Sequence, residues 1–247
     1  MNETLEIYIN SRKANNYYNG LISDALYLLP TIEVSQDENA LISIKNAVIP
    51  YSFYNVNNTN NKLNYVIDGV NYSIYLIVGN YNVNTLKSHL IELLGNSFII
   101  AYISKTNKFI FTHSTDDFIF LSTSNCFEIL GFKDNYNYSS FNLSLTSTIS
   151  INLFTIKNIY VCSDNFILNN IDSNNHNKSN IICSIPVNGS MNSILFYEDN
   201  TKHLVYKLGN IQNLRLTLTD EDGELIDFND VHYSITLEIT IVKKINN

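Results

Sequence analysis

The segment LRLTLTDEDGELIDFNDVHYSITLEITIV (214–242) contains two runs in which apolar and polar residues alternate. In the first run, Leu214, Leu216 and Leu218 fall on one face of an extended chain. In the second run, the apolar residues at alternate positions are Tyr233, Ile235, Leu237, Ile239 and Ile241. Because successive side chains of a strand point to opposite faces, both runs are predicted to be half-buried antiparallel β-strands. Between them, Asp220–Gly223 predicts a tight turn, since an Asp-Gly pair readily adopts the positive φ that such turns need.

Less regular strands are predicted at 4–9, 41–49, 62–67, 72–78, 156–162, 180–185 and 193–197. The alternation breaks near Asn46, which predicts a β-bulge there. Ten or more short strands separated by turn residues, with no helix alternating between them, are typical of a β-sandwich or barrel. We therefore expect an all-β fold, a two-sheet antiparallel jelly roll that forms a single domain over residues 1–247.

One region has a different pattern. VNTLKSHLIELLG (83–95) places leucines at helical spacing, with Asn82 or Asn84 as candidate N-cap and Gly95 just after the end. Three strand candidates and the short apolar turn CFEILGF (126–132) follow it. The sequence thus predicts a small α+β insertion, a helix-plus-hairpin module at 79–132, and a long polar loop at 169–180.

Composition excludes several classes of protein. The formal net charge of −8 argues against wrapping nucleic acid, which requires clustered Lys and Arg. No stretch approaches the 18 or so apolar residues of a membrane span, and MNETLEIYIN lacks the features of a signal peptide. The three cysteines, Cys126, Cys162 and Cys183, have neither disulfide-framework nor zinc-site spacing, so we expect buried free thiols.

No catalytic, cofactor-binding or metal-binding residue is predicted. A metal site of the cupin type needs a His-x-His pair, and the five histidines are all far apart in the sequence: His89, His113, His176, His203 and His232. Asp220–Gly223 resembles the start of a calcium loop, but strands flank it, which favours a β-turn. A Ser/His/Asp triad stays open, although the sequence has no G-x-S-x-G or phosphate-binding glycine loop. The corner at 79–82 is a weak candidate for an anion site at a helix start.

The stretch IPYSFYN (49–55) carries three aromatic residues directly after a proline. Pro50 has no backbone N–H, so it ends regular strand pairing. The aromatic side chains must then pack across the end of a sheet or against a neighbouring subunit. We interpret Pro50–Asn55 as a structural segment.

Four elements occur in an order that resembles penton proteins: IPYSFYN (49–55), GNYNVNTL (79–86), ILGF (129–132) and the closing segment from 214 to 239. Penton proteins are single jelly-roll capsid proteins of polinton-like viruses, virophages and related large double-stranded DNA viruses. In that family the last element is a terminal hairpin with an acidic-Gly turn. The residues that carry the match are Ile49, Pro50, Phe53, Tyr54, Asn55, Gly79, Asn80, Tyr81, Leu130, Gly131, Phe132 and Gly223.

This resemblance implies a non-catalytic structural protein of the virion. It implies a homopentamer at each icosahedral vertex, in contact with a double jelly-roll major capsid protein and with minor capsid proteins. Such a protein would assemble in the host cytoplasm or nucleus and would not be secreted. Three alternatives stay open: a non-vertex minor capsid or cement protein, a carbohydrate-binding jelly roll for host attachment, and a cupin-like metalloenzyme.

Overall fold

The computed structural model describes residues 3–166, 168, 180–199, 201–205 and 211–244. The chain forms two compact units. One, the sandwich unit, contains Met1–Phe53 and Ile156–Asn247; the other, the inserted unit, is Tyr54–Thr155. Of the predicted polar loop at 169–180 only residue 180 is described, and His176 lies outside the described residues.

The first sheet of the sandwich unit is antiparallel throughout. Its strand order is β1 (Glu3–Asn10), β17 (Ser234–Lys243), β4 (Glu38–Pro50) and β14 (Ile194–Glu198). Strand β15 (His203–Val205) also pairs with β4, further along the same edge. Strands β14 and β15 together therefore form one edge of the sheet, and β1 forms the other.

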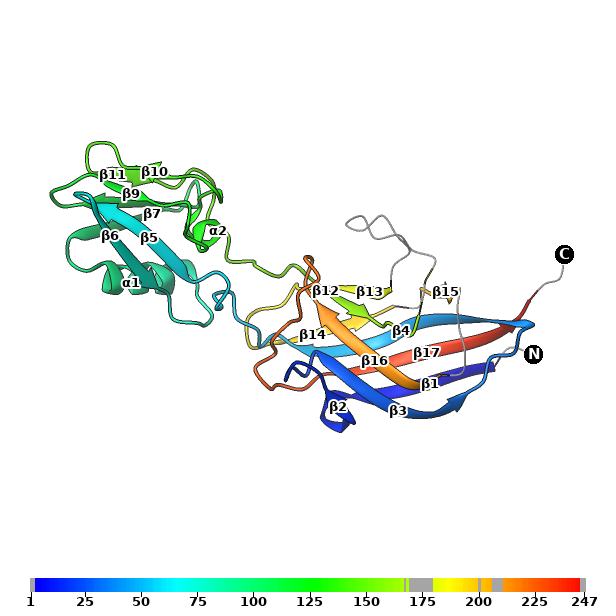
Figure 1. The fold of residues 1–247 in the computed structure, drawn as a ribbon. Helices are drawn as coiled ribbons and strands as arrows, with labels where there is room; N and C mark the ends of the chain where they lie inside the picture. The colour runs from blue at the N-terminus through cyan, green and yellow to red at the C-terminus, as the bar shows by residue number, and fades with distance from the viewer. Residues whose placement is uncertain (1–2, 167, 169–179, 200, 206–210, 245–247) are drawn as a thin grey trace. The chain divides into compact units, whose positions relative to one another are not determined.

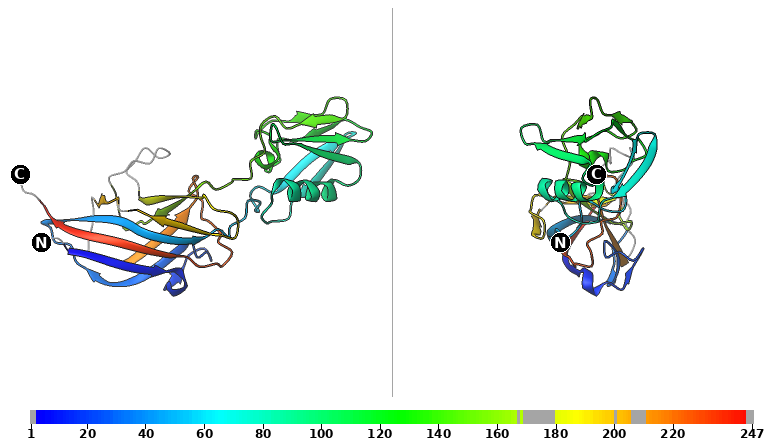
Figure 2. Two further views of the ribbon diagram at one scale, coloured as in Figure 1. Left: turned by 180° about the vertical axis from the view of Figure 1, so that it is seen from behind. Right: turned by 90° about the vertical axis from the view of Figure 1, so that its left-hand side faces the viewer.

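The second sheet packs over the first, as Figure 1 and the views of Figure 2 show. Its order is β13 (Ile181–Pro186), β12 (Asn158–Cys162), β16 (Ile211–Thr219), β3 (Asp24–Ile32) and β2 (Asn16–Tyr17). A short 3-10 helix, Ser11–Lys13, follows β1. Along the chain, β1 lies in the first sheet, β3 in the second, β4 in the first, β12 and β13 in the second, β14 and β15 in the first, β16 in the second and β17 in the first. This alternation between two sheets confirms the jelly roll predicted from the sequence.

The terminal hairpin expected from the family resemblance is wrong. Strand β16 pairs with β12 and β3, whereas β17 pairs with β1 and β4, so the two strands belong to opposite sheets. Their alternation predicted correctly which side chains are buried. It carries no information on which strand lies alongside, because two strands whose apolar faces meet across a sandwich have the same pattern as two strands of a hairpin.

The inward faces of both sheets make one hydrophobic core. The leucines of β16 and the apolar residues of β17 named above are all buried. Thr236 and Thr240, on the opposite face of β17, are buried as well, because β17 is a central strand. The bulge predicted near Asn46 is confirmed: Asn46 pairs with Thr236 and Ile44 with Leu237, which leaves Lys45 as the extra residue.

The inserted unit enters the jelly roll between β4 and β12. One sheet has the order β10 (Tyr138–Ser139), β9 (Phe118–Phe120), β5 (Lys62–Ile67) and β6 (Val70–Tyr75). A second sheet has the order β11 (Ser144–Thr146), β8 (Lys108–His113) and β7 (Phe98–Ile103), and two helices complete the unit, α1 (Val83–Leu94) and α2 (Phe127–Leu130). The unit is larger than the module expected at 79–132, because strands on both sides of that range complete its sheets.

Local signals in the inserted unit agree with the structure. Of the two predicted N-cap candidates, Asn82 caps helix α1: its side chain accepts hydrogen bonds from the backbone N–H groups of Asn84 and Thr85, and Gly95 follows the helix at φ 75°. The core of the unit is rich in fully buried phenylalanines: Phe109, Phe111, Phe118, Phe120, Phe127 and Phe132. Several of these rings meet edge to face, the geometry that aromatic quadrupoles favour. Among the described residues, neither helix has the length and apolarity that a bilayer span requires.

Candidate functional site

The residues of the IPYSFYN stretch separate into buried and exposed members. Ile49 and Phe53 are in the core of the sandwich unit, where the Phe53 ring stacks on Tyr51 at 4.5 Å between centroids and meets Phe228 edge-on at 6.1 Å. The side chain of Phe53 is only 3% exposed, whereas Tyr54 is 37% exposed. The aromatic residues after Pro50 therefore close one end of the sandwich, and Tyr54 is the member that faces solvent.

This end of the sandwich is also held by polar contacts to the connection between β16 and β17. The Ser52 hydroxyl donates to the Phe228 carbonyl at 2.6 Å, and the Asn229 side chain donates to the Ser52 carbonyl at 2.6 Å. The expectation that Pro50 ends strand pairing is wrong: Pro50 pairs with Ile194, and the Tyr51 N–H lies 2.9 Å from the Ser193 carbonyl. The segment has a structural role here, in agreement with our interpretation of it.

Asn55 connects the first two elements of the family resemblance. Its side-chain oxygen accepts the Tyr81 N–H at 2.9 Å, and its amide nitrogen donates to the carbonyls of Tyr81 and Leu153. The Asn80 side chain in turn accepts the Asn55 N–H at 3.0 Å. Next to this network, Val56 and Gly79 exchange two backbone hydrogen bonds. Asn55 and Val56 thus form a hydrogen-bonded junction with the GNYN element inside the inserted unit, and the corner at 79–82 serves this junction and the helix cap.

The two remaining elements are structural as well. Leu130 and Phe132 are fully buried in the inserted unit, and Gly131 ends α2 at φ 82°. A Cβ on Gly131 would lie 2.6 Å from the Ile149 carbonyl oxygen, so both conformation and space demand glycine there. Gly223 also has a positive φ, 84°, but open space around it.

The predicted turn at Asp220–Gly223 is confirmed, with the Gly223 N–H donating to the Asp220 carbonyl at 3.2 Å. The Asp220 side chain accepts the N–H groups of Asp222 and Glu224, and burial raises the pKa of its carboxyl group above the ordinary value. Glu221 accepts two N–H groups at the start of β12. These carboxylates stabilise backbone groups of the protein.

The described histidines do not converge. His89 accepts the Ile77 N–H and stacks on Tyr81, while His113 accepts the Asp116 N–H. His203 belongs to β15, and His232 lies 3.0 Å from the Ser11 hydroxyl. Within the part of the chain that the structure describes, no group of three His, Cys, Asp or Glu side chains is placed to hold a metal ion.

Among the described residues, Ser11 and His232 form a serine–histidine pair, and the sequence offered no signal for it. Ser11 is fully buried, and its hydroxyl oxygen accepts the Tyr233 N–H at 2.9 Å. The Tyr17 hydroxyl donates to the Ser11 carbonyl. The pair joins the end of β1 to the start of β17 and gives no substrate access to the hydroxyl.

The cysteines and the buried carboxylate Asp24 also have environments that do not suit catalysis. None of the three described cysteines forms a disulfide; Cys126 and Cys162 are buried as expected, and Cys183 is half-buried. Burial raises the pKa of the Cys126 and Cys183 thiols, which disfavours the nucleophilic thiolate. Asp24 forms a bidentate ion pair with Arg215 at 2.7 and 2.8 Å.

Two surfaces are suited to contact with other proteins. The first, the β14 patch, consists of Ile194 and Phe196 together with their cross-strand partners Pro50 and Val48. Ile194 and Phe196 are 67% and 65% exposed and lie on the same face of an edge strand. The second is the edge strand β6, whose Val70, Tyr72 and Tyr75 are all exposed. Exposed apolar residues concentrated on edge strands are typical of interaction sites.

Comparison with solved structures matches the chain to the mavirus penton protein, with a TM-score of 0.51 at 12% identity. The alignment covers 99% of this chain and 100% of the mavirus chain. The chain has the fold of the mavirus penton protein. The alignment therefore spans both the sandwich unit and the inserted unit. The resemblance noted from the sequence is thus confirmed at the level of the fold.

A chain of the 3.5 Å cryo-EM structure of the Sputnik virophage also matches, with a TM-score of 0.40 and 11% identity over 97% of this chain and 98% of that one. No protein-family model and no curated protein matches the sequence. Most residues of the resemblance are buried or hydrogen-bonded within their unit, whereas Tyr54 faces solvent and Gly223 lies in a turn with open space around it.

Proposed function

We propose that the protein is a viral capsid protein, a penton that forms homopentamers at the vertices of an icosahedral virion. The observation that carries this proposal is the fold, shared over nearly the full length of both chains with the mavirus penton protein. The proposed role is structural: the chain acts by self-assembly and by surface complementarity, with no catalysis.

The exposed edges support assembly into a closed ring. A five-fold ring is built from heterologous contacts, so each subunit must present two different surfaces. The β14 patch and the β6 edge differ in chemistry: the β14 patch is aliphatic and aromatic, and the β6 edge is rich in tyrosine. Both combine large apolar area with few charges, the composition typical of the centre of an interface.

The chemistry of the described residues supports a non-catalytic role. The side chains that most often carry catalysis are used to satisfy backbone groups or each other, as in the Ser11–His232 and Asp24–Arg215 pairs. The proposed partners are other copies of the chain, a double jelly-roll major capsid protein and minor capsid proteins. The proposed location is the capsid of the virion.

Native mass spectrometry of the purified full chain tests the proposal directly. Five subunits support the penton assignment, and three subunits favour the alternative of a non-vertex minor capsid or cement protein. A monomer that binds glycans saturably on an array would instead support the host-attachment alternative and contradict the penton proposal.

The β14 patch can be tested in the same measurement. The double variant Ile194→Ser/Phe196→Ser should stay folded and lose the pentamer, because both side chains project from the surface of the isolated chain. The matched control is Ile99→Ser on β7, which is 66% exposed in the inserted unit outside both surfaces. A pentamer that survives the double variant would exclude the β14 patch as a ring contact.

A further inference from the structure

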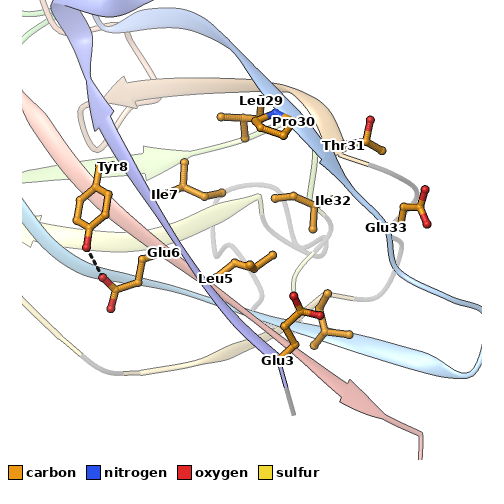
Figure 3. Close-up of a pocket in the computed structure, with 11 residues that line it drawn as sticks. Glu3, Leu5, Glu6, Ile7, Tyr8, Leu29, Pro30, Thr31, Ile32 and Glu33 are labelled. Carbon is orange, nitrogen blue, oxygen red and sulfur yellow. Dashed lines mark hydrogen bonds between the residues drawn. The ribbon is translucent and has the colours of Figure 1, made fainter. Parts of the chain in front are cut away.

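A groove of about 670 Å³ opens between β1 and β3, on the side of the sandwich unit opposite the β14 edge. Figure 3 shows Ile7 of β1 and Ile32 of β3 pointing toward one another across it, with Leu5 and Leu29 beside them. Ile241 of β17 is also part of its lining. The groove is of the size that binding pockets of proteins commonly have.

The groove forms where the edge strands β1 and β3 of the two sheets lie beside each other without a further element of the described chain between them. Ile9 is buried near the C-terminal end of β1, but Leu5 and Ile7, on the same face of that strand, are only half-buried. Strand β2 covers β3 only at Ala25 and Leu26. From Leu28 onward, no strand of the described part of the chain pairs with β3 on that side, so the core-facing side chains of both strands remain accessible.

Both walls of the groove are strand edges. β1 is the end strand of the first sheet, and β3 beyond Leu26 is an edge of the second. An edge strand presents backbone N–H and C=O groups that an added extended segment can pair with. On β3 the Leu28 N–H already donates to the Asn15 side chain at 2.8 Å and Pro30 has no N–H, so β1 is the edge that is open to such pairing. The groove therefore offers backbone pairing together with an apolar floor.

The rim of the groove is acidic. Glu3 and Glu33 line its ends, and within the described residues neither forms an ion pair. Glu6 lines it too but is paired with Lys45, and the lining contains no Lys or Arg among the described residues. Opposite charge favours association across an interface and like charge disfavours it. Because the chain itself carries a net charge of −8, these carboxylates oppose another copy as the occupant.

We propose that this groove binds an extended segment of another polypeptide that has apolar side chains at alternate positions and at least one Lys or Arg. The segment adds to the free edge of β1, its apolar side chains contact Leu5, Ile7, Leu29 and Ile32, and its cation contacts Glu3 or Glu33. At a rise of about 3.3 Å per residue, some five or six residues of an extended segment match the length of the groove wall along β1. This inference goes beyond the penton proposal and does not depend on it.

Selection of short random peptides displayed on phage, with the full-length protein as target, tests the inference. Peptides that also bind the variant Ile7→Trp are removed first, because the larger ring fills the groove. We expect the enriched peptides to alternate apolar residues with Lys or Arg. Enrichment of peptides without basic residues, or no enrichment after the subtraction, would overturn the inference.

The acidic rim is tested with an enriched peptide, labelled and measured by fluorescence anisotropy at low salt. Glu3→Gln/Glu33→Gln should raise its Kd about tenfold, because the charge attraction is lost. The control Glu92→Gln/Glu128→Gln makes the same change in net charge at exposed positions of the inserted unit and should leave Kd within about twofold.

Equal affinity for both double variants would contradict the inference, even if Ile7→Trp proved unable to fold. If Glu3→Gln/Glu33→Gln changed the number of subunits in the intact oligomer, the groove would be a contact between copies, and the inference would be overturned as well. Neither result would bear on whether the wild-type protein is a pentamer.

Discussion

Replacing Phe53 with alanine tests the conclusion that the aromatic residues after Pro50 close the sandwich. The ring is 3% exposed and belongs to the core of the sandwich unit, in contact with Tyr51 and Phe228. Alanine at this position removes the ring and leaves a cavity between the other two. The matched variant is Tyr54→Ala, one residue further along, where the side chain is 37% exposed.

The expected cost follows from burial. A fully buried Phe→Ala substitution lowers the free energy of unfolding by about 3–5 kcal/mol, because transfer energy is lost and a cavity is formed. Each aromatic pair that is lost accounts for about 0.5–1.5 kcal/mol beyond its area. At about 2–4 °C per kcal/mol for a chain of this size, the loss lowers Tm by roughly 6–20 °C. Tyr54→Ala should change the free energy of unfolding by about 1 kcal/mol or less.

The measurement should resolve the two units, because a chain with two cores need not unfold in one step. The chain has no tryptophan, so thermal unfolding is best followed by far-UV circular dichroism and calorimetry. Amide hydrogen exchange read by mass spectrometry then assigns the loss: peptides from the sandwich unit should exchange faster in Phe53→Ala, and those from the inserted unit should not. A Phe53→Ala cost below about 1 kcal/mol, or an equal cost for Tyr54→Ala, would refute the reasoning.

Three further variants give distinct outcomes. In a denaturant titration, Gly131→Ala should lower the free energy of unfolding clearly more than Gly223→Ala. Both glycines have positive φ, which costs a non-glycine residue about 1–2 kcal/mol. Only at Gly131 does a backbone carbonyl oxygen also lie 2.6 Å from the added Cβ. Burial raises the pKa of Tyr27 to about 12. Between pH 10 and 12 the unfolded chain therefore loses the Tyr27 proton while the folded chain keeps it. This group alone should lower the free energy of unfolding by about 1.4 kcal/mol per pH unit in that range. Tyr27→Phe should reduce that slope between pH 10 and 12 relative to wild type, and an unchanged slope would contradict the assignment. Asn55→Ala leaves the Tyr81 backbone groups without partners and should cost about 2–4 kcal/mol, seen as faster amide exchange at the start of the inserted unit.

Local patterns were reliable where the periodicity or the capping signal of an element is strong. The alternation in β16 and β17 predicted their buried faces, the break near Asn46 predicted the bulge, and Asn82 with Gly95 predicted both ends of α1. Each of these features depends on side chains within a few residues of one another. Strand β3 was missed because its sequence, DALYLLPTI, alternates poorly and contains Pro30.

The sequence alone was enough to predict the fold class and the resemblance to the penton fold. Strand periodicity, helix caps and turns depend on residues close together in the chain, so they can be read without knowing which elements pack together. Only the tertiary structure decided that β16 and β17 lie in opposite sheets, that Asn55 joins two distant elements, and that β1 and β3 leave a groove with an acidic rim. The physical reason is that pairing, junctions and grooves depend on which surfaces meet. An amphipathic strand buries its apolar face equally well beside a neighbour or across a core, so its own sequence does not choose between them.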